Sequence, residues 1–243
     1  MRWTIKLVVT PSTCKYTQVA VSALNACGFQ EDDVEVIATR GTPLSVDDSQ
    51  VSKKKLKRAD LIGCKPTAIQ SQLFAEAIIG QSNSLISNTD IVLVMTPNIL
   101  LWHAFKRFME ATIEEKYMAV YFPYTPSRFF LVNDRPMPTF THGWYKFLCD
   151  EPVSGSVCLC MNSHTAVLLG SIIRQDLVSD AASWATISWE YQLSQMLFRS
   201  KVDCYGAGVP FAYEAGNEDD LSRVVPLDRG LKSGFERRNW YLN

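Results

Sequence analysis

Short apolar runs alternate with segments of helical periodicity along the first half of the chain. Residues 5–10 are mostly apolar, residues 16–27 carry apolar side chains at helical spacing, and Val34–Thr39 is a second apolar run. Gly28 ends the helical segment, and Arg40-Gly41 closes the second run. A strand, a helix and a strand in this order predict a parallel sheet with crossover helices.

The alternation of helices and strands continues to residue 213. Pro66 opens a helical segment over residues 66–80, and an apolar strand is predicted over Ile91–Met95. The remaining predicted elements are a helix over residues 97–109, strands over 118–122 and 156–161, a helix over 189–199, and short strands over 202–205 and 210–213. We expect the polar residues from 216 on to form a surface tail. This order of elements predicts an α/β fold.

Length and composition are those of a globular chain with one large core. The 243 residues are 47% apolar and 20% charged. A net charge of −1 gives no reason to expect nucleic acid or an anionic membrane as the main partner. No window holds the roughly 18 consecutive apolar residues of a membrane helix. The apolar run after Met1 is too short for a signal sequence.

Cysteines and a basic run favour structural roles. The seven cysteines are an odd number without disulfide spacing, so reduced thiols in a cytosolic setting are the simpler inference. Cys158, Cys160 and His164 allow a metal or nucleophile site, although Cys158 and Cys160 share one face of a predicted strand and free cysteine commonly acts as an apolar residue. The basic run at residues 53–58 allows nuclear targeting or phosphate steering, but such runs are usually solvated helix faces.

An acidic residue stands at the mouth of the strand Ile91–Met95. Asp90 closes the polar cluster Ser87-Asn88-Thr89-Asp90. A carboxylate beside a buried strand needs a positive partner, so a metal or sugar-nucleotide site is expected here. An Asp that caps the strand from a loop is the alternative.

Several segments occur in an order known from glycosyltransferases. They are Asn88-Thr89-Asp90, Tyr121-Phe122-Pro123, Gly143-Trp144-Tyr145, Gly155-Ser156-Val157-Cys158 and Trp189-Glu190-Tyr191-Gln192-Leu193. In this order they resemble the Asp-x-Asp, Tyr-Phe-Pro, Gly-Phe-Trp, Gly-x-x-Cys and Trp-Gly-x-Glu-Asp motifs of the chondroitin N-acetylgalactosaminyltransferase and β1,4-galactosyltransferase group of GT-A glycosyltransferases. The resemblance covers roughly residues 5–215. It implies a GT-A-like nucleotide-binding fold with a mixed central sheet flanked by helices.

The resemblance implies a UDP-sugar donor, and open α/β sheets bind ligands outside the carboxyl ends of their strands. Thr10 and Pro11 after the first strand, and Arg40 after the second, are expected to face the nucleotide. Lys65 falls near the position where the resembled family carries an Asn-Arg or Ser-Arg pair before its helix. Arg40 and Lys65 are the cations best placed for a diphosphate, with ordinary turn residues and solvated surface cations as the alternative.

The resemblance also implies Mn²⁺ at the donor phosphates. Asn88 and Asp90 occupy the Asp-x-Asp positions, so an amide replaces the first of two carboxylates and predicts weak metal binding. The histidine that is a further metal ligand in the family is missing from residues 209–214, where Glu214 is the available substitute.

Glu190 is the predicted catalytic base. Inverting transfer needs a carboxylate to take the proton of the acceptor hydroxyl, and alignment of the helix leucines puts Glu190 on the family's catalytic Asp. A one-residue slip puts Tyr191 there and leaves no base, and an acid in a first helical turn is also favoured by the helix dipole. Trp144 and Trp189 are the predicted acceptor-binding residues because sugars stack on exposed indoles, with core packing as the alternative.

Together these features predict one glycosyltransferase-like domain, with a nucleotide-sugar-binding half (1–115), an acceptor and catalytic half (116–215) and an irregular tail (216–243). The predicted function is inverting transfer of a hexose or N-acetylhexosamine from a UDP-sugar to a glycan hydroxyl. A catalytically inactive relative that binds a nucleotide, a glycan or a protein is the alternative, because Asn88, Gln192 and the missing histidine depart from the motifs. Cellular members of the family are Golgi membrane proteins, so the chain is expected to be cytoplasmic unless it is an excised luminal domain.

Overall fold

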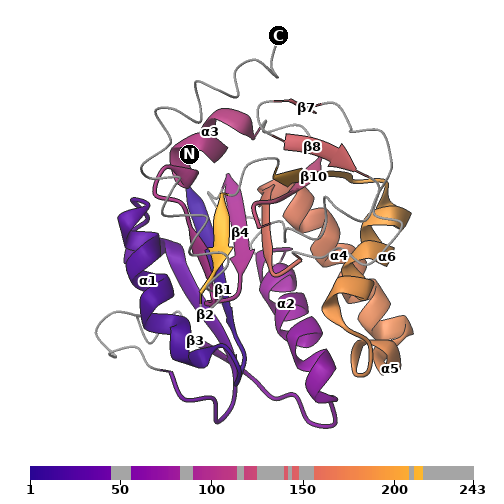
Figure 1. The fold of residues 1–243 in the computed structure, drawn as a ribbon. Helices are drawn as coiled ribbons and strands as arrows, with labels where there is room; N and C mark the ends of the chain where they lie inside the picture. Colours follow the sequence, from indigo (N-terminus) through magenta and orange to yellow (C-terminus); the bar gives the residue numbers. More distant parts are fainter. Residues whose placement is uncertain are drawn as a thin grey trace.

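The computed structural model describes residues 1–44, 56–82, 90–113, 118–124, 140–141, 144–147, 156–207 and 211–215. Within these residues the strands form one mixed sheet in the order β3-β2-β1-β4-β9-β6-β10-β8-β7, and helices cover both of its faces (Figure 1). The predicted α/β fold with a mixed central sheet flanked by helices is confirmed. Asn88 and the predicted tail lie outside the described residues.

The element bounds are as follows. The large sheet contains β1 (Trp3–Val9), β2 (Val34–Thr39), β3 (Leu56–Ala59), β4 (Ile91–Met95), β6 (Ala119–Phe122), β7 (Phe140–Thr141), β8 (Trp144–Phe147), β9 (Cys158–Asn162) and β10 (Asp203–Ala207). A second sheet pairs β5 (Ile99–Leu101) with β11 (Ala212–Glu214). The helices are α1 (Thr17–Ala26), α2 (Pro66–Ser82), α3 (Phe105–Thr112), α4 (Ser163–Ser179), α5 (Ala181–Trp184) and α6 (Trp189–Ser200).

The opening β-α-β unit has the predicted parallel pairing. β2 runs parallel to β1, with Ile5 opposite Val34, and β4 runs parallel to β1 on its other side, with Trp3 opposite Ile91. Between β1 and β2, α1 ends at Ala26, and Gly28 follows two residues later with a φ of +85°, the left-handed conformation that glycine adopts without a side-chain clash. The parallel arrangement predicted for these strands is confirmed.

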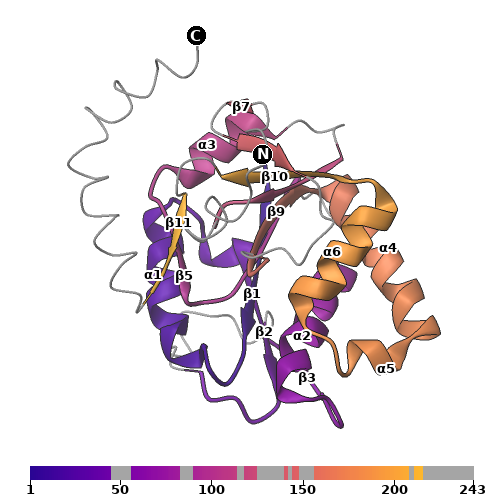
Figure 2. The ribbon, with the colours of Figure 1, turned by 45° about the vertical axis from the view of Figure 1, so that its right-hand side comes forward.

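The strand order places a topological switch point between β1 and β4. From β1 the chain proceeds to β2 and β3 on one side and then returns to β4 on the other. α1 and α3 pack on one face of the sheet, and α2, α4 and α6 pack on the opposite face (Figure 2). In open α/β sheets a ligand binds outside the carboxyl ends of the strands at such a point. A ligand site is therefore expected at the carboxyl edge beside β1 and β4.

The second half of the sheet contains the reversal that makes it mixed. β9 lies between β4 and β6 and runs antiparallel to both, with Leu93 opposite Cys160. β10 runs parallel to β6, and β8 runs antiparallel to β10. As a result, β4, β6 and β10 all end at the carboxyl edge that β1 and β2 share.

Some elements differ from those that the sequence predicts. The helix predicted over residues 97–109 is wrong in its first half, because residues 99–101 pair with β11 and α3 begins only at Phe105. A partner more than 100 residues away satisfies this backbone, and local periodicity does not reveal it. α4 was not predicted, although Ala166, Leu169 and Ile173 recur at helical spacing on its buried side. The end of the basic run forms the edge strand β3 instead of a helix face.

Candidate functional site at the carboxyl edge

The turn after β1 is a cluster of hydroxyl groups. Thr10 directly follows β1 and is buried. Its hydroxyl oxygen lies 2.9 Å from that of Ser12 and 3.0 Å from that of Thr13, and its backbone N–H donates to Thr13 Oγ1 at 3.0 Å. Pro11 is exposed between them. The predicted nucleotide-facing turn therefore has a fixed shape and presents polar groups at the edge of the sheet.

The loops after β2 and β3 are joined by an ion pair. Arg40 follows β2, and its guanidinium lies 3.2 Å from the carboxylate of Asp60, which follows β3. The Arg40 side chain is 71% exposed, so the pair contributes little to stability and leaves the guanidinium accessible to a phosphate. Arg58 adds a second link, because its Nη1 donates to the carbonyls of Thr39 and Thr42 at 3.0 and 2.8 Å.

Lys65 lies at the start of α2, next to the segment that leads into α6. Its backbone N–H donates to the carbonyl of Ala185 at 3.1 Å, and its side chain is exposed. One turn into α2, the hydroxyl of Ser71 donates to the carbonyl of Ile187 at 2.8 Å. These bonds hold the α2 start against the residues that precede α6.

Trp189 fixes the start of α6 to the carboxyl end of β4. Its indole N–H donates to the carbonyl of Ser156 at 2.8 Å, and its ring stacks on Phe74 of α2 with the centroids 4.7 Å apart. Val157, the residue after Ser156, accepts a bond of 3.0 Å from the backbone N–H of Thr96, which directly follows β4. The N-terminus of α6 is thereby tied to the end of a central strand through one turn.

Glu190 is the next residue of α6 and is exposed in its first turn. The hydrogen bond of the Trp189 indole ties the start of α6 to the segment beside the end of β4. Glu190 therefore belongs to the same edge of the sheet as Thr10. The predicted base, the predicted nucleotide turn and the predicted cations thus all belong to segments at the carboxyl edge of the sheet. An exposed carboxylate here can take a proton from a hydroxyl that approaches this edge.

The predicted acceptor-binding tryptophans are both buried. Trp144 is 1% exposed and Trp189 is 2% exposed. The Trp144 ring packs against Phe211 and Tyr121, each with a centroid separation of 5.1 Å. The expectation of exposed indoles is therefore corrected: both rings are covered by other aromatic side chains in the core, and neither face is open to a sugar.

Asp90 lies at the edge opposite to Thr10 and Arg40. It precedes β4, so in a parallel pairing with β1 it lies where the strands begin. Its carboxylate accepts a bond of 2.8 Å from the backbone N–H of Arg2, and its own N–H donates to the carbonyl of Arg2 at 2.9 Å. β4 has five residues, which separates its two ends by about 16 Å. The expectation that Asp90 meets the diphosphate and its metal is corrected by this position, and the strand-capping alternative describes it.

Thr96 and Asn98 are the polar residues that follow β4 at the carboxyl edge. Asn98 donates from Nδ2 to Glu214 Oε1 at 2.9 Å, and the hydroxyl of Tyr124 donates to Glu214 Oε2 at 3.3 Å. Asn98 Oδ1 and Thr96 Oγ1 are buried and have no hydrogen-bond partner. Thr96, Asn98 and Tyr124 were not predicted as site residues, although each follows a predicted strand and that position was the available signal.

The described side chains at the end of β4 do not fit a Mn²⁺ ion. Mn²⁺ needs several oxygen ligands and negative charge to offset its own. Glu214 supplies one carboxylate, both of whose oxygens accept hydrogen bonds, and Asn98 supplies a neutral amide. In the part of the chain that the structure describes, no group of three or more His, Cys, Asp or Glu side chains could hold a metal.

Comparisons with known proteins give a structural likeness. No protein-family model and no curated protein matches the chain. Among solved structures, the chain is similar to S. aureus TarS. With the crystal structure of TarS 1–349 the TM-score is 0.45 at 14% identity, covering 92% of this chain and 64% of that one. With a second TarS structure the TM-score is 0.44 at 13% identity, covering 93% of this chain and 39% of that one. Nothing in these comparisons supports the specific group that the sequence motifs resemble.

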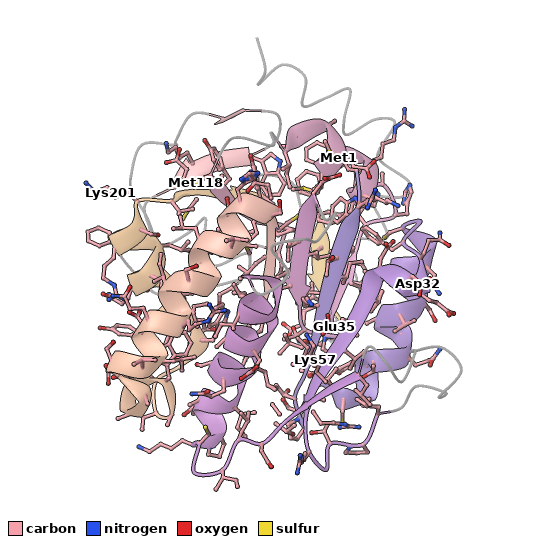
Figure 3. The ribbon with its side chains drawn as sticks, turned by 180° about the vertical axis from the view of Figure 1, so that it is seen from behind. Met1, Asp32, Glu35, Lys57, Met118 and Lys201 are labelled. Carbon is pink, nitrogen blue, oxygen red and sulfur yellow. The ribbon has the colours of Figure 1, made fainter. Side chains whose placement is uncertain are left out.

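Part of the basic run neutralises a carboxylate inside the fold. Lys57 Nζ lies 2.5 Å from Glu35 (Figure 3). The buried Lys6 forms a second ion pair with the same carboxylate. Burial alone would raise the pKa of Glu35, but the ammonium groups of Lys57 and Lys6 hold it below its ordinary value. Lys57 therefore has a structural partner, whereas residues 53–55 lie outside the described part.

The cysteine pair of β9 lies in the core. Cys158 and Cys160 are both fully buried and contact the same apolar cluster. Burial raises the pKa of both thiols, so they stay protonated at neutral pH. A protonated thiol is neither a metal ligand nor a nucleophile, and the packing role is the one that the structure supports.

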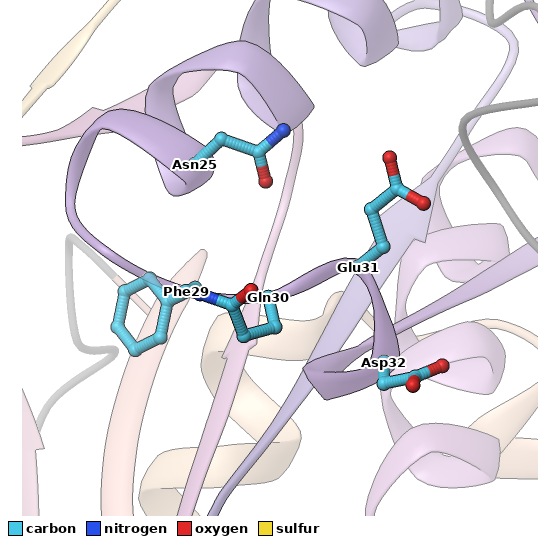
Figure 4. Close-up of a pocket in the computed structure, with 5 residues that line it drawn as sticks. All are labelled: Asn25, Phe29, Gln30, Glu31 and Asp32. Atoms are coloured by element: carbon cyan, nitrogen blue, oxygen red, sulfur yellow. The ribbon is translucent and has the colours of Figure 1, made fainter.

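A pocket of about 440 Å³ lies at the amino edge, away from the residues described above. Its walls are Asn25, Phe29, Gln30, Glu31 and Asp32, from the end of α1 and the approach to β2 (Figure 4). The pocket contains none of the predicted site residues.

Among the described residues, no helix is long and apolar enough to cross a membrane.

Proposed function

We propose that this chain is an inverting glycosyltransferase that moves a hexose or N-acetylhexosamine from a UDP-sugar to a glycan hydroxyl. The observation that carries the proposal is the position of Glu190. Glu190 is exposed in the first turn of α6, and the Trp189–Ser156 and Thr96–Val157 hydrogen bonds tie the start of this helix to the carboxyl end of β4. This is the edge at which open α/β sheets bind their ligands.

In the proposed reaction the acceptor hydroxyl attacks the anomeric carbon while the bond from that carbon to the diphosphate oxygen breaks. Glu190 takes the proton of the hydroxyl, and UDP leaves with the bonding electron pair. The turn after β1, which contains Thr10 and Pro11, binds the nucleotide. Arg40 and Lys65, both exposed, offset the negative charge that develops on the diphosphate.

The test is Glu190→Gln, which keeps the size of the side chain but removes proton acceptance. UDP binding should survive, while release of UDP from UDP-sugars with mixed glycan acceptors should fall by on the order of 10²–10⁴-fold. Glu31→Gln, an exposed acid at the amino edge, is the matched control and should leave release unchanged. Undiminished release in Glu190→Gln would remove Glu190 from the mechanism.

A second candidate function is a nucleotide- or glycan-binding protein without transfer activity. The observation that favours it is the neutral character of Thr96 and Asn98, since carboxylates at the end of β4 would help to bind a metal–diphosphate group. UDP binding without release from any UDP-sugar tested would select this function.

A further inference from the structure

Glu214 of β11 lies next to the end of β4, where neutral groups donate hydrogen bonds to it. Both of its carboxylate oxygens accept such bonds, one from Asn98 Nδ2 at 2.9 Å and one from the Tyr124 hydroxyl at 3.3 Å. Tyr124 is buried, and Glu214 and Asn98 are partly buried. A divalent cation that bound Glu214 would face these two donors and would have to displace them.

The orientation of the Asn98 amide is consistent with a site for neutral ligand groups. Because Nδ2 points to Glu214, Oδ1 faces away from it and has no partner, and Thr96 Oγ1 is also without one. Buried oxygens of this kind are costly unless something donates to them. Ligand hydroxyl groups are suitable donors, and they need no metal.

We propose that the carboxyl edge binds its nucleotide diphosphate without a divalent cation, and that Thr96 and Asn98 accept hydrogen bonds from ligand hydroxyls instead. This rests on the proposed function for the identity of the nucleotide. The exposed Arg40 and Lys65 supply positive charge at the neighbouring loops. The inference differs from the Mn²⁺ site that the motif resemblance implies, because Asp90 lies at the other edge.

A single substitution should introduce metal dependence. Asn98→Asp replaces the amide that donates to Glu214 by a carboxylate, so two carboxylates then face each other across about one hydrogen-bond length. Like charges at this separation repel, and a bound cation relieves the repulsion. Asp90→Asn is the matched control, since it alters a carboxylate that is hydrogen-bonded to Arg2 at the opposite edge.

The experiment is calorimetric titration of UDP into the wild-type protein, Asn98→Asp and Asp90→Asn, each with EDTA and with excess MnCl₂. For the wild type and Asp90→Asn, the dissociation constant should change by less than about threefold between the two conditions. For Asn98→Asp, Mn²⁺ should tighten UDP binding by about tenfold or more, equivalent to ~1.4 kcal/mol. Titration of Mn²⁺ alone, followed by the electron paramagnetic resonance of the free ion, should show binding to Asn98→Asp and none to the wild type.

The outcomes separate the two proposals. Wild-type binding of UDP that needs Mn²⁺, or tightens about tenfold with it, overturns metal independence and leaves the proposed function standing. Absence of UDP binding under both conditions overturns the proposed function and this inference with it. If Asn98→Asp fails to unfold cooperatively on heating, Thr96→Asp replaces it, and the wild-type comparison stands by itself.

Discussion

The indole N–H of Trp189 donates a hydrogen bond of 2.8 Å to the backbone carbonyl of Ser156. This bond joins the first residue of α6 to the turn before β9. The same turn contacts the end of β4, because the carbonyl of Val157 accepts a hydrogen bond from the backbone N–H of Thr96. A residue expected to stack on a sugar therefore positions its neighbour, Glu190, from inside the core. Its substitution should be seen first in stability.

Trp189→Phe keeps an aromatic ring against Phe74 but leaves the buried carbonyl of Ser156 without a donor. The free energy of unfolding should fall by about 1–3 kcal/mol, measured by urea denaturation. Tyr191→Phe, at an exposed position of the same helix, is the control and should change it by less than about 0.5 kcal/mol. Equal stability of the two variants would contradict the structural role of the Trp189 N–H.

Glu35→Gln should destabilise the fold by about 3 kcal/mol near neutral pH, because it removes the carboxylate that forms an ion pair with the buried ammonium of Lys6. The folded-state pKa of Glu35 is held below its ordinary value of 4.5 by Lys57 and Lys6, against the opposing effect of burial. Its ionised form therefore stabilises the fold above that value, and this contribution is lost as the pH falls through the folded-state pKa.

The measurement for Glu35 is denaturant unfolding of the wild type and Glu35→Gln from neutral pH into acid. The stability difference between them should shrink below pH 4.5. Glu31→Gln, at an exposed position, should track the wild type throughout. A difference that stays constant into acid would contradict the ion pairs.

The cysteines should separate into two groups by reactivity. Cys14 and Cys64 are partly exposed, whereas Cys27 is buried and burial raises its pKa to about 11. Since the thiolate is the reactive form, a maleimide or disulfide reagent should label Cys14 and Cys64 in the native protein, and Cys27 only with denaturant. Peptide mapping by mass spectrometry distinguishes the sites.

Labelling in denaturant is the control for Cys27, because all three thiols should then react at similar rates. Native labelling of Cys27 as fast as Cys14 would contradict its burial. The raised pKa also predicts a loss of stability at high pH. The protonated Cys27 thiol stabilises the fold fully below the ordinary value of 9.0, and this contribution is lost as the pH rises toward 11.

Local pattern and chain connectivity were enough to predict the architecture around β1, β2 and β4. Apolar runs at β1, β2 and β4 with a helix between the first two require parallel pairing, because a crossover helix returns the chain to the starting edge. Thr10 and Arg40 directly follow their strands, so this connectivity also places them at one edge. The start of α6 was likewise predicted from its helical periodicity.

Long-range packing decided the rest of the site. Asn98 meets Glu214 only because β5 pairs with β11, and their 116-residue separation leaves no local signal. The burial of Trp144 depends on rings from distant segments, so its aromatic character alone did not distinguish a sugar platform from core. For Asp90 the direction of β4 was decisive, because a residue that precedes a parallel strand lies at the edge where the strands begin. Only the assembled sheet shows that this edge lies opposite to the one where Glu190 lies.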